Sequence, residues 1–243
     1  MNDEVTLDGV FDLHIHSSPD LFPRRLDDID AARQAAEAGM AGILLKSHHT
    51  MTADRAQIAA KIVPGIKVYG SLTLNDPVGG MNMAAVDTAL RAGAREIFMP
   101  TISARNDKRA KLQEGGIHIF DSTAGKALKE ILALIRDFNA VLATGHLSKE
   151  EIAILVRMAV KQGLKKIVVT HPEHPLIDLS PKEQQGLLQK GVLFERCFAS
   201  TLHGLGDIPM EQIVNEIREV GTASTLISTV LGTEGYPLPV EGM

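Results

Sequence analysis

Short apolar runs alternate with longer amphipathic segments along this chain. The runs are VFDLHIH, GILLK, IKVYGSLTL, REIFMPT, AVLATGH, KKIVVTH, VLFERCF and TLISTVL. Their almost continuous apolar character is typical of strands in a parallel sheet that is covered on both faces. The pattern therefore predicts eight parallel strands.

The segments between these runs carry the start and stop signals of helices. Ser148 and Glu151 have the spacing of a capping box at the start of one segment, and Gly163 ends it. Similar helix patterns run through residues 26–39, 180–191 and 208–221. In contrast, residues 102–122 are polar and non-periodic, which predicts a long functional or mobile loop.

Eight strands that alternate with seven helices predict a (β/α)8 barrel of the α/β class, with a TIM-like architecture. The tail GTEGYPLPVEGM is rich in Pro and Gly, so it predicts an irregular end without a clear eighth helix, and the barrel could be distorted there. No linker divides the chain, which predicts one domain over residues 1–243. The alternative is an open doubly wound sheet, but the chain has no GxGxxG or P-loop motif to support it.

Composition narrows the classes of function. Of the 243 residues, 44% are hydrophobic, which is enough for a sizeable core. The net charge is -5 without a block of like charge, so nucleic acid is not expected as a main partner. Cys197 is the single cysteine, which excludes an internal disulfide and is typical of a reducing compartment. With neither a secretory signal nor a membrane span in the sequence, we expect a cytoplasmic protein that acts on a small molecule. The sequence does not determine the oligomeric state, so both a monomer and a homo-oligomer stay open.

The first apolar run contains two histidines one residue apart, in FDLHIHSSPD. In a regular strand, alternate side chains share a face. This predicts that His14 and His16 share one face, opposite Phe11, Leu13 and Ile15. Two imidazoles side by side at a strand end are either half of a metal site or ordinary polar residues.

Two further histidines end later strands, His146 in ATGHLS and His171 in VVTHPEHP. Because the active sites of such barrels lie at the C-terminal ends of the strands, the side chains of His14, His16, His146 and His171 are expected to meet at one rim. Imidazole is a common ligand of transition metals. The arrangement therefore favours a divalent metal site, with Zn²⁺ as the first choice and Mn²⁺ as the second.

Other polar residues at the predicted strand ends are candidates for the same site. Lys46 ends the second run, where it is either solvated or in contact with the metal or the substrate. Glu195 lies in a buried strand and needs a partner there. Arg105 belongs to a basic stretch that could hold a carboxylate or phosphate, or else form an ordinary solvated loop. The candidates for substrate binding are Lys46, His48, Asn75, Arg105 and Glu195.

These motifs resemble the amidohydrolase superfamily of metal-dependent hydrolases, and within it a small uncharacterised branch. The resemblance rests on DLHIHSSPD, LLKSHHTMTADRA, LNDPVGGMN, MPTISARN, ATGHLS, VVTHPE and GYPLPVEGM, which together span nearly the whole chain. It implies that His14, His16, His146 and His171 bind the metal. It also implies hydrolysis of an amide, a cyclic amide or imide, an ester or a lactone by a metal-activated water.

The sequence departs from the superfamily pattern at Val230. The resemblance implies an Asp at this position, at the end of strand eight, which binds the metal and accepts the proton of the attacking water. Valine can do neither. The chain is then an inactivated variant, a binding protein that has lost catalysis, or an enzyme with another base. The candidates for that base are Glu195, Glu173, His174 and Glu234.

The bridging lysine or glutamate that the superfamily commonly carries on strand four is also missing, because MPT stands there. Lys46 on strand two could take that place, for example as a carbamate. One metal ion is therefore preferred over two. Two other interpretations stay open: a phosphoesterase of the polymerase-and-histidinol-phosphatase type, and a non-catalytic barrel that binds a metal or another ligand.

Overall fold

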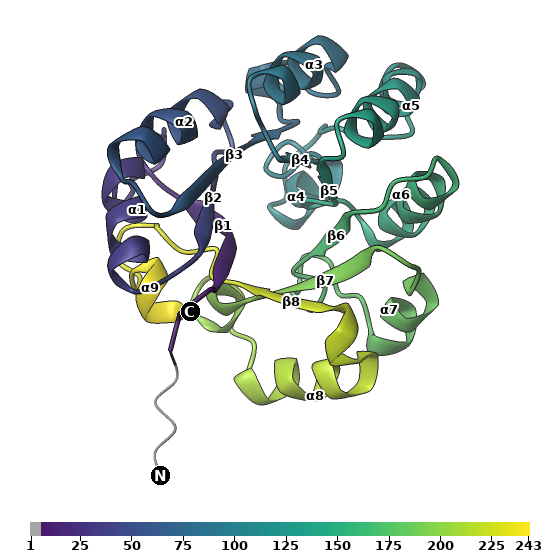
Figure 1. Ribbon diagram of the computed structural model, residues 1–243. Helices are drawn as coiled ribbons and strands as arrows, with labels where there is room; N and C mark the ends of the chain where they lie inside the picture. Colours follow the sequence, from purple (N-terminus) through teal and green to yellow (C-terminus); the bar gives the residue numbers. More distant parts are fainter. Residues whose placement is uncertain (1–5) are drawn as a thin grey trace.

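Eight parallel strands form one sheet in the computed structural model, which describes residues 6–243. Neighbouring strands follow the order of the chain, and helices surround the sheet (Figure 1). Each strand lies inside one of the eight apolar runs, so the predicted (β/α)8 barrel is confirmed. The strands are β1 (Phe11–His16), β2 (Gly42–Lys46), β3 (Lys67–Thr73), β4 (Glu96–Phe98), β5 (Val141–Ala143), β6 (Ile167–Thr170), β7 (Val192–Cys197) and β8 (Thr225–Ser228).

One main helix lies between each pair of consecutive strands, as the alternating pattern predicts. Ser148 and Glu151 form the predicted capping box at the start of the helix between β5 and β6. The seven helices are α1 (Asp28–Glu37), α2 (Ala53–Ile62), α3 (Met83–Arg91), α5 (Ser122–Asp137), α6 (Lys149–Lys161), α7 (Pro181–Leu187) and α8 (Met210–Val220).

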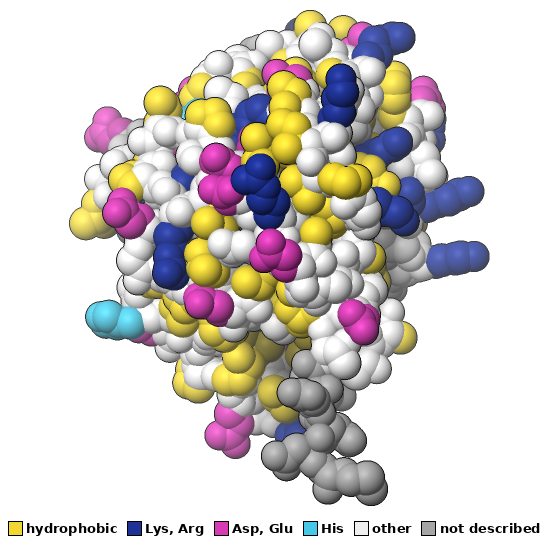
Figure 2. Space-filling view, turned by 60° about the vertical axis from the view of Figure 1, so that its left-hand side comes forward, with side chains coloured by type: hydrophobic (Ala, Val, Ile, Leu, Met, Phe, Trp, Pro, Cys, Tyr) yellow, Lys and Arg dark blue, Asp and Glu magenta, His cyan; other side chains and the backbone are white. Residues whose placement is uncertain are grey.

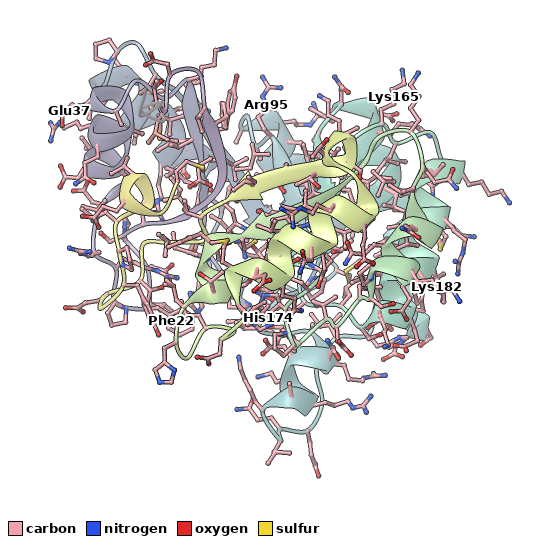
Figure 3. All side chains as sticks on the ribbon, turned by 90° about the horizontal axis from the view of Figure 1, so that it is seen from below. Phe22, Glu37, Arg95, Lys165, His174 and Lys182 are labelled. Carbon is pink, nitrogen blue, oxygen red and sulfur yellow. The ribbon has the colours of Figure 1, made fainter. Side chains whose placement is uncertain are left out.

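The polar segment after β4 contains one more helix, α4 (Arg105–Ala110). The prediction of an irregular loop is therefore wrong for these six residues. A bridge between Ala104 and Ile117 joins the two ends of the segment. Figure 3 shows α4, in teal, projecting from the end of the barrel that carries His174, whereas Arg95 lies at the opposite end.

The tail after β8 is not wholly irregular, because it ends in the short helix α9 (Pro239–Gly242). Val240 and Met243 pack against the apolar cluster that lies under α1 and α2. The expectation of an irregular tail is corrected to this extent. The four residues of α9 do not cover β8, where the side chain of Ile227 is 56% exposed.

The barrel closes between β1 and the segment that follows β8. The N–H of Val230 donates to the carbonyl of His14 at 2.9 Å, and the N–H of His16 donates to the carbonyl of Leu231 at 2.8 Å. The buried carboxyl group of Asp12 bonds to the backbone N–H and the hydroxyl of Thr229. The strand that carries both histidines is therefore fixed by the segment that contains Val230.

The register of β1 against β2 shifts near the middle of the strand. Phe11 packs against the apolar cluster inside the barrel, whereas Ile15 packs in the outer layer under α1 and α2. The prediction that Phe11, Leu13 and Ile15 share one face is therefore wrong, because a bulge interrupts the alternation. His14 and His16 do share a face, since both line the same interior cavity.

On the face shown in Figure 2, acidic and basic side chains are interspersed with apolar ones. Across residues 6–243, no helix combines the length and the apolar character that a bilayer crossing requires.

Candidate functional site

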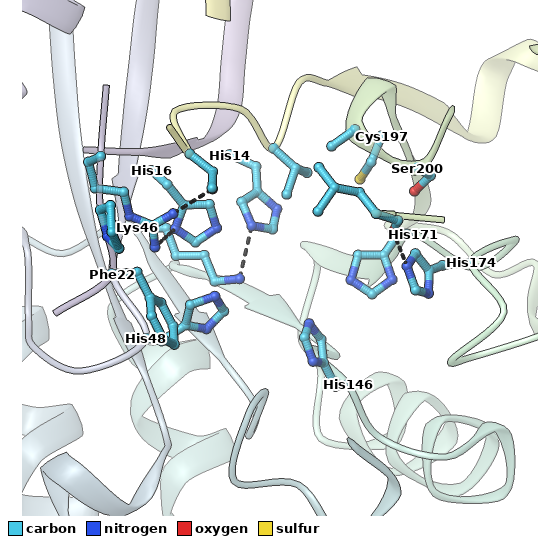
Figure 4. A pocket seen from close by; sticks show the side chains of 16 residues that line it. His14, His16, Phe22, Lys46, His48, His146, His171, His174, Cys197 and Ser200 are labelled. Atoms are coloured by element: carbon cyan, nitrogen blue, oxygen red, sulfur yellow. Dashed lines mark hydrogen bonds between the residues drawn. The ribbon is translucent and has the colours of Figure 1, made fainter. Parts of the chain in front are cut away.

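A cavity of about 350 Å³ opens at the C-terminal ends of the strands (Figure 4). Lys46 and Arg24 contribute positive charge to its wall. Within the part of the chain that the structure describes, no Asp or Glu belongs to this wall. Its histidines are His14, His16, His48, His146, His171 and His174. The four histidines predicted to meet at one rim therefore do surround one space, together with two more.

His14 lies between a cation and a carboxyl group. Nζ of Lys46 is 2.9 Å from Nε2 of His14, and Oε1 of Glu195 is 3.0 Å from Nδ1 of the same ring. All three side chains are buried. Burial and the neighbouring Lys46 hold the pKa of His14 well below its usual value, so the ring is neutral. Because an ammonium group only donates, Nε2 accepts and the ring proton lies on Nδ1, facing Glu195.

Burial also shifts the two groups on either side of His14. It lowers the pKa of Lys46 to about 8, against the opposing effect of Glu195. It raises the pKa of Glu195 to about 7, against the opposing effects of Ser228 and Lys46. Both groups therefore titrate much closer to neutral pH than in water, a pattern found often at functional sites.

His16 has a different hydrogen-bond partner. Nη2 of Arg24 lies 3.3 Å from Nδ1 of His16, and Asp20 holds the same guanidinium group at 2.9 Å. Burial keeps the pKa of His16 well below its usual value. Since arginine only donates, the neutral His16 ring carries its proton on Nε2 in this arrangement. His16 must exchange this tautomer before Nε2 can bind a metal.

Asp107 of α4 orients His146. Its carboxylate lies 2.9 Å from Nδ1 of His146 and also binds Lys111. Burial lowers the pKa of His146 to about 4, although Asp107 opposes the shift. A carboxylate behind a histidine fixes the ring and its tautomer, as it does behind metal-binding histidines. Asp107 lies in the non-periodic segment, so no sequence pattern indicated this role.

His171 and His174 differ in whether their ring nitrogens have hydrogen-bond partners. His171 has a φ angle of +31°, and its Nδ1 is buried without a hydrogen-bond partner. In His174, by contrast, Nε2 lies 2.6 Å from the carbonyl of Leu205 and Nδ1 accepts from the N–H of Leu176. Because both ring nitrogens of His174 are engaged, this ring has no lone pair left to accept a proton from a water.

Val230 lines the cavity where the resemblance implies an Asp. Its φ angle of +57° lies in the left-handed region, which is rare for a β-branched residue. None of the other candidate bases is placed to replace the missing Asp as the proton acceptor. Glu173 is buried outside the cavity wall and pairs with Arg196 at 2.9 Å. Glu195 lies behind His14, and Glu234 is exposed.

The predicted substrate-binding residues are not all at the cavity. Lys46 and His48 line it, whereas Asn75, Arg105 and Glu195 do not. Asn75 is buried and donates to the hydroxyl of Thr101, which in turn lies 2.8 Å from Nδ1 of His48. Arg105 pairs with Asp121. Asn75 therefore supports His48, and direct substrate binding by Asn75, Arg105 and Glu195 stays a prediction.

The donors around the cavity fit a divalent metal in their chemistry. His14 and His16 form one pair, with ring centroids 5.4 Å apart, and His146 and His171 form a second pair at 5.1 Å. Each neutral ring has a lone pair that can bind a metal ion. Nδ1 of His171 is buried and has no hydrogen-bond partner. Among residues 6–243, only one trio of His, Cys, Asp or Glu brings its ligand atoms within 4.8 Å of one another, and it consists of His14, Glu195 and Cys197.

Comparison with known proteins agrees with the fold. No curated protein matches the sequence. Among solved structures, a TatD homologue, YjjV from Escherichia coli K12, is 17% identical with a TM-score of 0.57, and the match covers 96% of this chain and 85% of that chain. An amidohydrolase from Pseudomonas aeruginosa is 13% identical with a TM-score of 0.60, covering 95% of this chain and 76% of that one.

An organophosphorus hydrolase from Deinococcus radiodurans is 10% identical with a TM-score of 0.55, and the match covers 94% of this chain and 80% of that chain. At these identities the likeness establishes the barrel and not the reaction. The model of one protein family, described as a family of unknown function (DUF6282), matches residues 9–195. The chain therefore belongs to the DUF6282 family.

Proposed function

We propose that this protein is a metal-dependent hydrolase of the amidohydrolase type. Its substrate would be a small molecule with an amide, cyclic amide or imide, ester or lactone bond. The observation that carries the proposal is the set of neutral histidines, buried or nearly so, from β1 and from the ends of β5 and β6 around one cavity. A volume of about 350 Å³ suits a small substrate.

A divalent ion at this site would lower the pKa of a bound water and polarise the bond to be cleaved. His14, His16, His146 and His171 are the residues proposed to hold it. Neutral imidazoles suit Zn²⁺ first and Mn²⁺ second. Glu195 fixes the tautomer of His14, and Asp107 fixes that of His146, which points their Nε2 lone pairs away from these carboxyl groups.

Lys46 and Arg24 would face the substrate from the cavity wall. Their positive charge favours an oxygen that gains negative charge during the reaction. The proton of the attacking water has no carboxylate acceptor in the wall, because Val230 stands where the resemblance implies an Asp. Loss of a general base costs about 10²–10⁴ in rate, so slow turnover is expected from this chain.

A second candidate function is ligand binding without catalysis. The observation that favours it is the same acid-free wall, since Val230, Cys197, Ala199 and Leu205 make one side of the cavity apolar. In this case the protein would bind a small molecule tightly and release it unchanged.

The test is a substrate panel of lactones, esters, amides, cyclic imides and phosphoesters. The protein is stripped with a chelator and then supplied with Zn²⁺ or Mn²⁺. Metal-dependent turnover that His146→Ala abolishes would support the proposal, whereas turnover that survives chelation would contradict it. Ligand binding without turnover, in the parent and in Val230→Asp alike, would favour the second candidate.

A further inference from the structure

His48 follows β2 and lines the cavity beside both pairs of proposed metal ligands. Its ring stacks on that of His16, with centroids 4.9 Å apart, and its centroid lies 6.2 Å from that of His146 (Figure 4). The ring of Phe22 packs edge-on against it, with centroids 6.0 Å apart. The ring of His48 therefore borders the space that a substrate would occupy.

The amide group of Asn75 begins a chain of hydrogen bonds that ends at this ring. Its Oδ1 accepts from the backbone N–H groups of Thr101 at 2.8 Å and of Ser103 at 3.1 Å. Its Nδ2 donates to the carbonyl of His48 at 2.9 Å and to the hydroxyl of Thr101 at 2.7 Å. A flipped amide would set its NH2 group against two N–H groups and its oxygen against a carbonyl. These contacts therefore determine the orientation of the amide.

The hydroxyl of Thr101 passes this constraint on to His48. Its oxygen accepts from Asn75 and lies 2.8 Å from Nδ1 of His48. Thr101 is buried, and within the described part of the chain no other group accepts its hydroxyl proton. If Nδ1 carried a proton, this hydroxyl would be left without an acceptor, which is rare for buried polar groups. The hydroxyl therefore donates, and Nδ1 of His48 accepts.

Nε2 of His48 consequently carries the ring proton. No group among residues 6–243 forms a hydrogen bond with this Nε2, although the residue lines the cavity. The same tautomer of His16 depends on one contact of 3.3 Å with Arg24. In contrast, the tautomer of His48 depends on a buried chain that is anchored to backbone groups after β3 and β4. The ring therefore presents a fixed and unused N–H donor.

We infer that His48 is a catalytic residue that donates from Nε2 to the carbonyl oxygen of the bond being hydrolysed, and that Thr101 and Asn75 are the positioning residues that fix its tautomer. This inference rests on the proposed hydrolase function and adds a role for a side chain outside the proposed ligand set.

The donor suits the charge that develops in hydrolysis of an ester or an amide. Attack by water forms a new carbon–oxygen bond and moves an electron pair of the C=O bond onto the carbonyl oxygen, while the proton of the water passes to solvent. The C=O bond then forms again, and the leaving group departs and takes a proton from solvent. His48 keeps its proton throughout and stabilises the negative oxygen by its hydrogen bond, so it does not replace the missing base.

The tautomer can be measured without turnover, on protein treated with a chelator. In protein labelled with ¹⁵N-histidine, long-range ¹H–¹⁵N spectra distinguish protonated from unprotonated ring nitrogens, and His48→Phe identifies the signals of this ring. We expect the proton on Nε2 in the parent and in Thr101→Ser, which keeps the hydroxyl. Thr101→Val removes the hydroxyl and should give a mixture of tautomers. A parent with the proton on Nδ1 would overturn the inference, whatever the variants do.

Kinetics test the catalytic role on each ester, lactone, amide and imide that the zinc-loaded parent hydrolyses. His48→Phe keeps the aromatic packing and removes the donor, so kcat should fall by about 10²–10³ with a much smaller change in KM. His48→Gln restores an N–H near the position of Nε2 and should regain at least about 10-fold. Thr101→Val should lower kcat, and Thr101→Ser should restore it. The matched control is His203→Phe, which alters an exposed histidine and should keep the kinetics of the parent.

Zinc content separates the donor role from a ligand role. His48→Phe should bind as much zinc per chain as the parent. Loss of zinc from this variant would make His48 a ligand, and unchanged kcat would show that its N–H does not act on the substrate. Either result would overturn the inference and leave the proposed function standing. If the parent hydrolyses no substrate with Zn²⁺ or Mn²⁺, the proposed function fails and the catalytic role of His48 fails with it.

Discussion

Nζ of Lys46 lies 2.9 Å from Nε2 of His14 inside the barrel. The ammonium group is buried and donates to a lone pair that a metal ion could also use. Two unit charges about 4 Å apart repel by roughly 4 kcal/mol at an effective dielectric constant near 20. Lys46 therefore opposes metal binding next to His14 as long as it keeps its proton.

The first prediction concerns Lys46→Met, which keeps the length of the side chain and removes the charge. We expect this variant to bind Zn²⁺ or Co²⁺ at least about 10-fold more tightly at neutral pH, because the repulsion is lost. Competition titration against a chelating dye measures the affinity. Lys149→Met, which removes an ammonium group on α6, serves as the control. Weaker metal binding by Lys46→Met would instead make Lys46 a part of the metal site.

The second prediction concerns Val230→Asp, which restores a carboxylate to the cavity wall. We expect hydrolysis to rise by about 10²–10⁴, the usual contribution of a general base. Val230→Asn is the matched control, since it has the same shape and accepts no proton. Asn and Asp tolerate a positive φ better than Val does, so neither variant should lower the free energy of unfolding. Equal activity of the Asp and Asn variants would exclude the missing base as the cause of slow turnover.

The third prediction separates Glu173 from catalysis. Arg196 is buried and bonds to Glu173, Glu216 and Gln184. Glu173→Ala removes the shorter of its two ion pairs, so we expect the free energy of unfolding to fall by about 3 kcal/mol in a urea titration. Glu183→Ala on α7 removes an exposed carboxylate and should cost far less. A stable Glu173→Ala protein that had lost turnover would instead support Glu173 as the base.

The fourth prediction concerns pH and the closure of the barrel. Burial raises the pKa of Asp12 to about 7, against the hydrogen bonds from Thr229 and His14. Between about pH 4 and pH 7 the unfolded chain releases this proton while the folded chain keeps it, so stability falls as the pH rises. Urea titrations should show a loss of about 3 kcal/mol for the parent relative to Asp12→Asn over this range. Parallel curves for the two proteins would contradict the raised pKa.

Much of the fold could be predicted from the sequence. Apolar runs such as GILLK and VLFERC are typical of strands that are covered on both faces. Eight such runs, alternating with helical segments, predict the barrel. Because strand ends meet at one rim, the positions of His14, His146 and His171 in their runs already indicate a common cavity.

Other features depend on contacts that no local pattern indicates. The bulge in β1 shifts the register of this strand against β2, so the alternation of Phe11 and Ile15 in the sequence could not reveal it. Asp107 lies in a segment without periodicity and meets His146 only because α4 folds over the end of the barrel. Similarly, the meeting of Cys197 with His14 joins positions far apart in the sequence.

The central claim is that the histidines of this cavity bind a metal, and metal content per chain tests it most directly. Protein purified without chelators is analysed by elemental analysis beside the double variant His14→Ala/His16→Ala. We expect about one equivalent of Zn²⁺ or a similar ion in the parent and almost none in the variant. A parent that stays free of metal after Zn²⁺ and Mn²⁺ are supplied, even with Val230→Asp, would contradict the account.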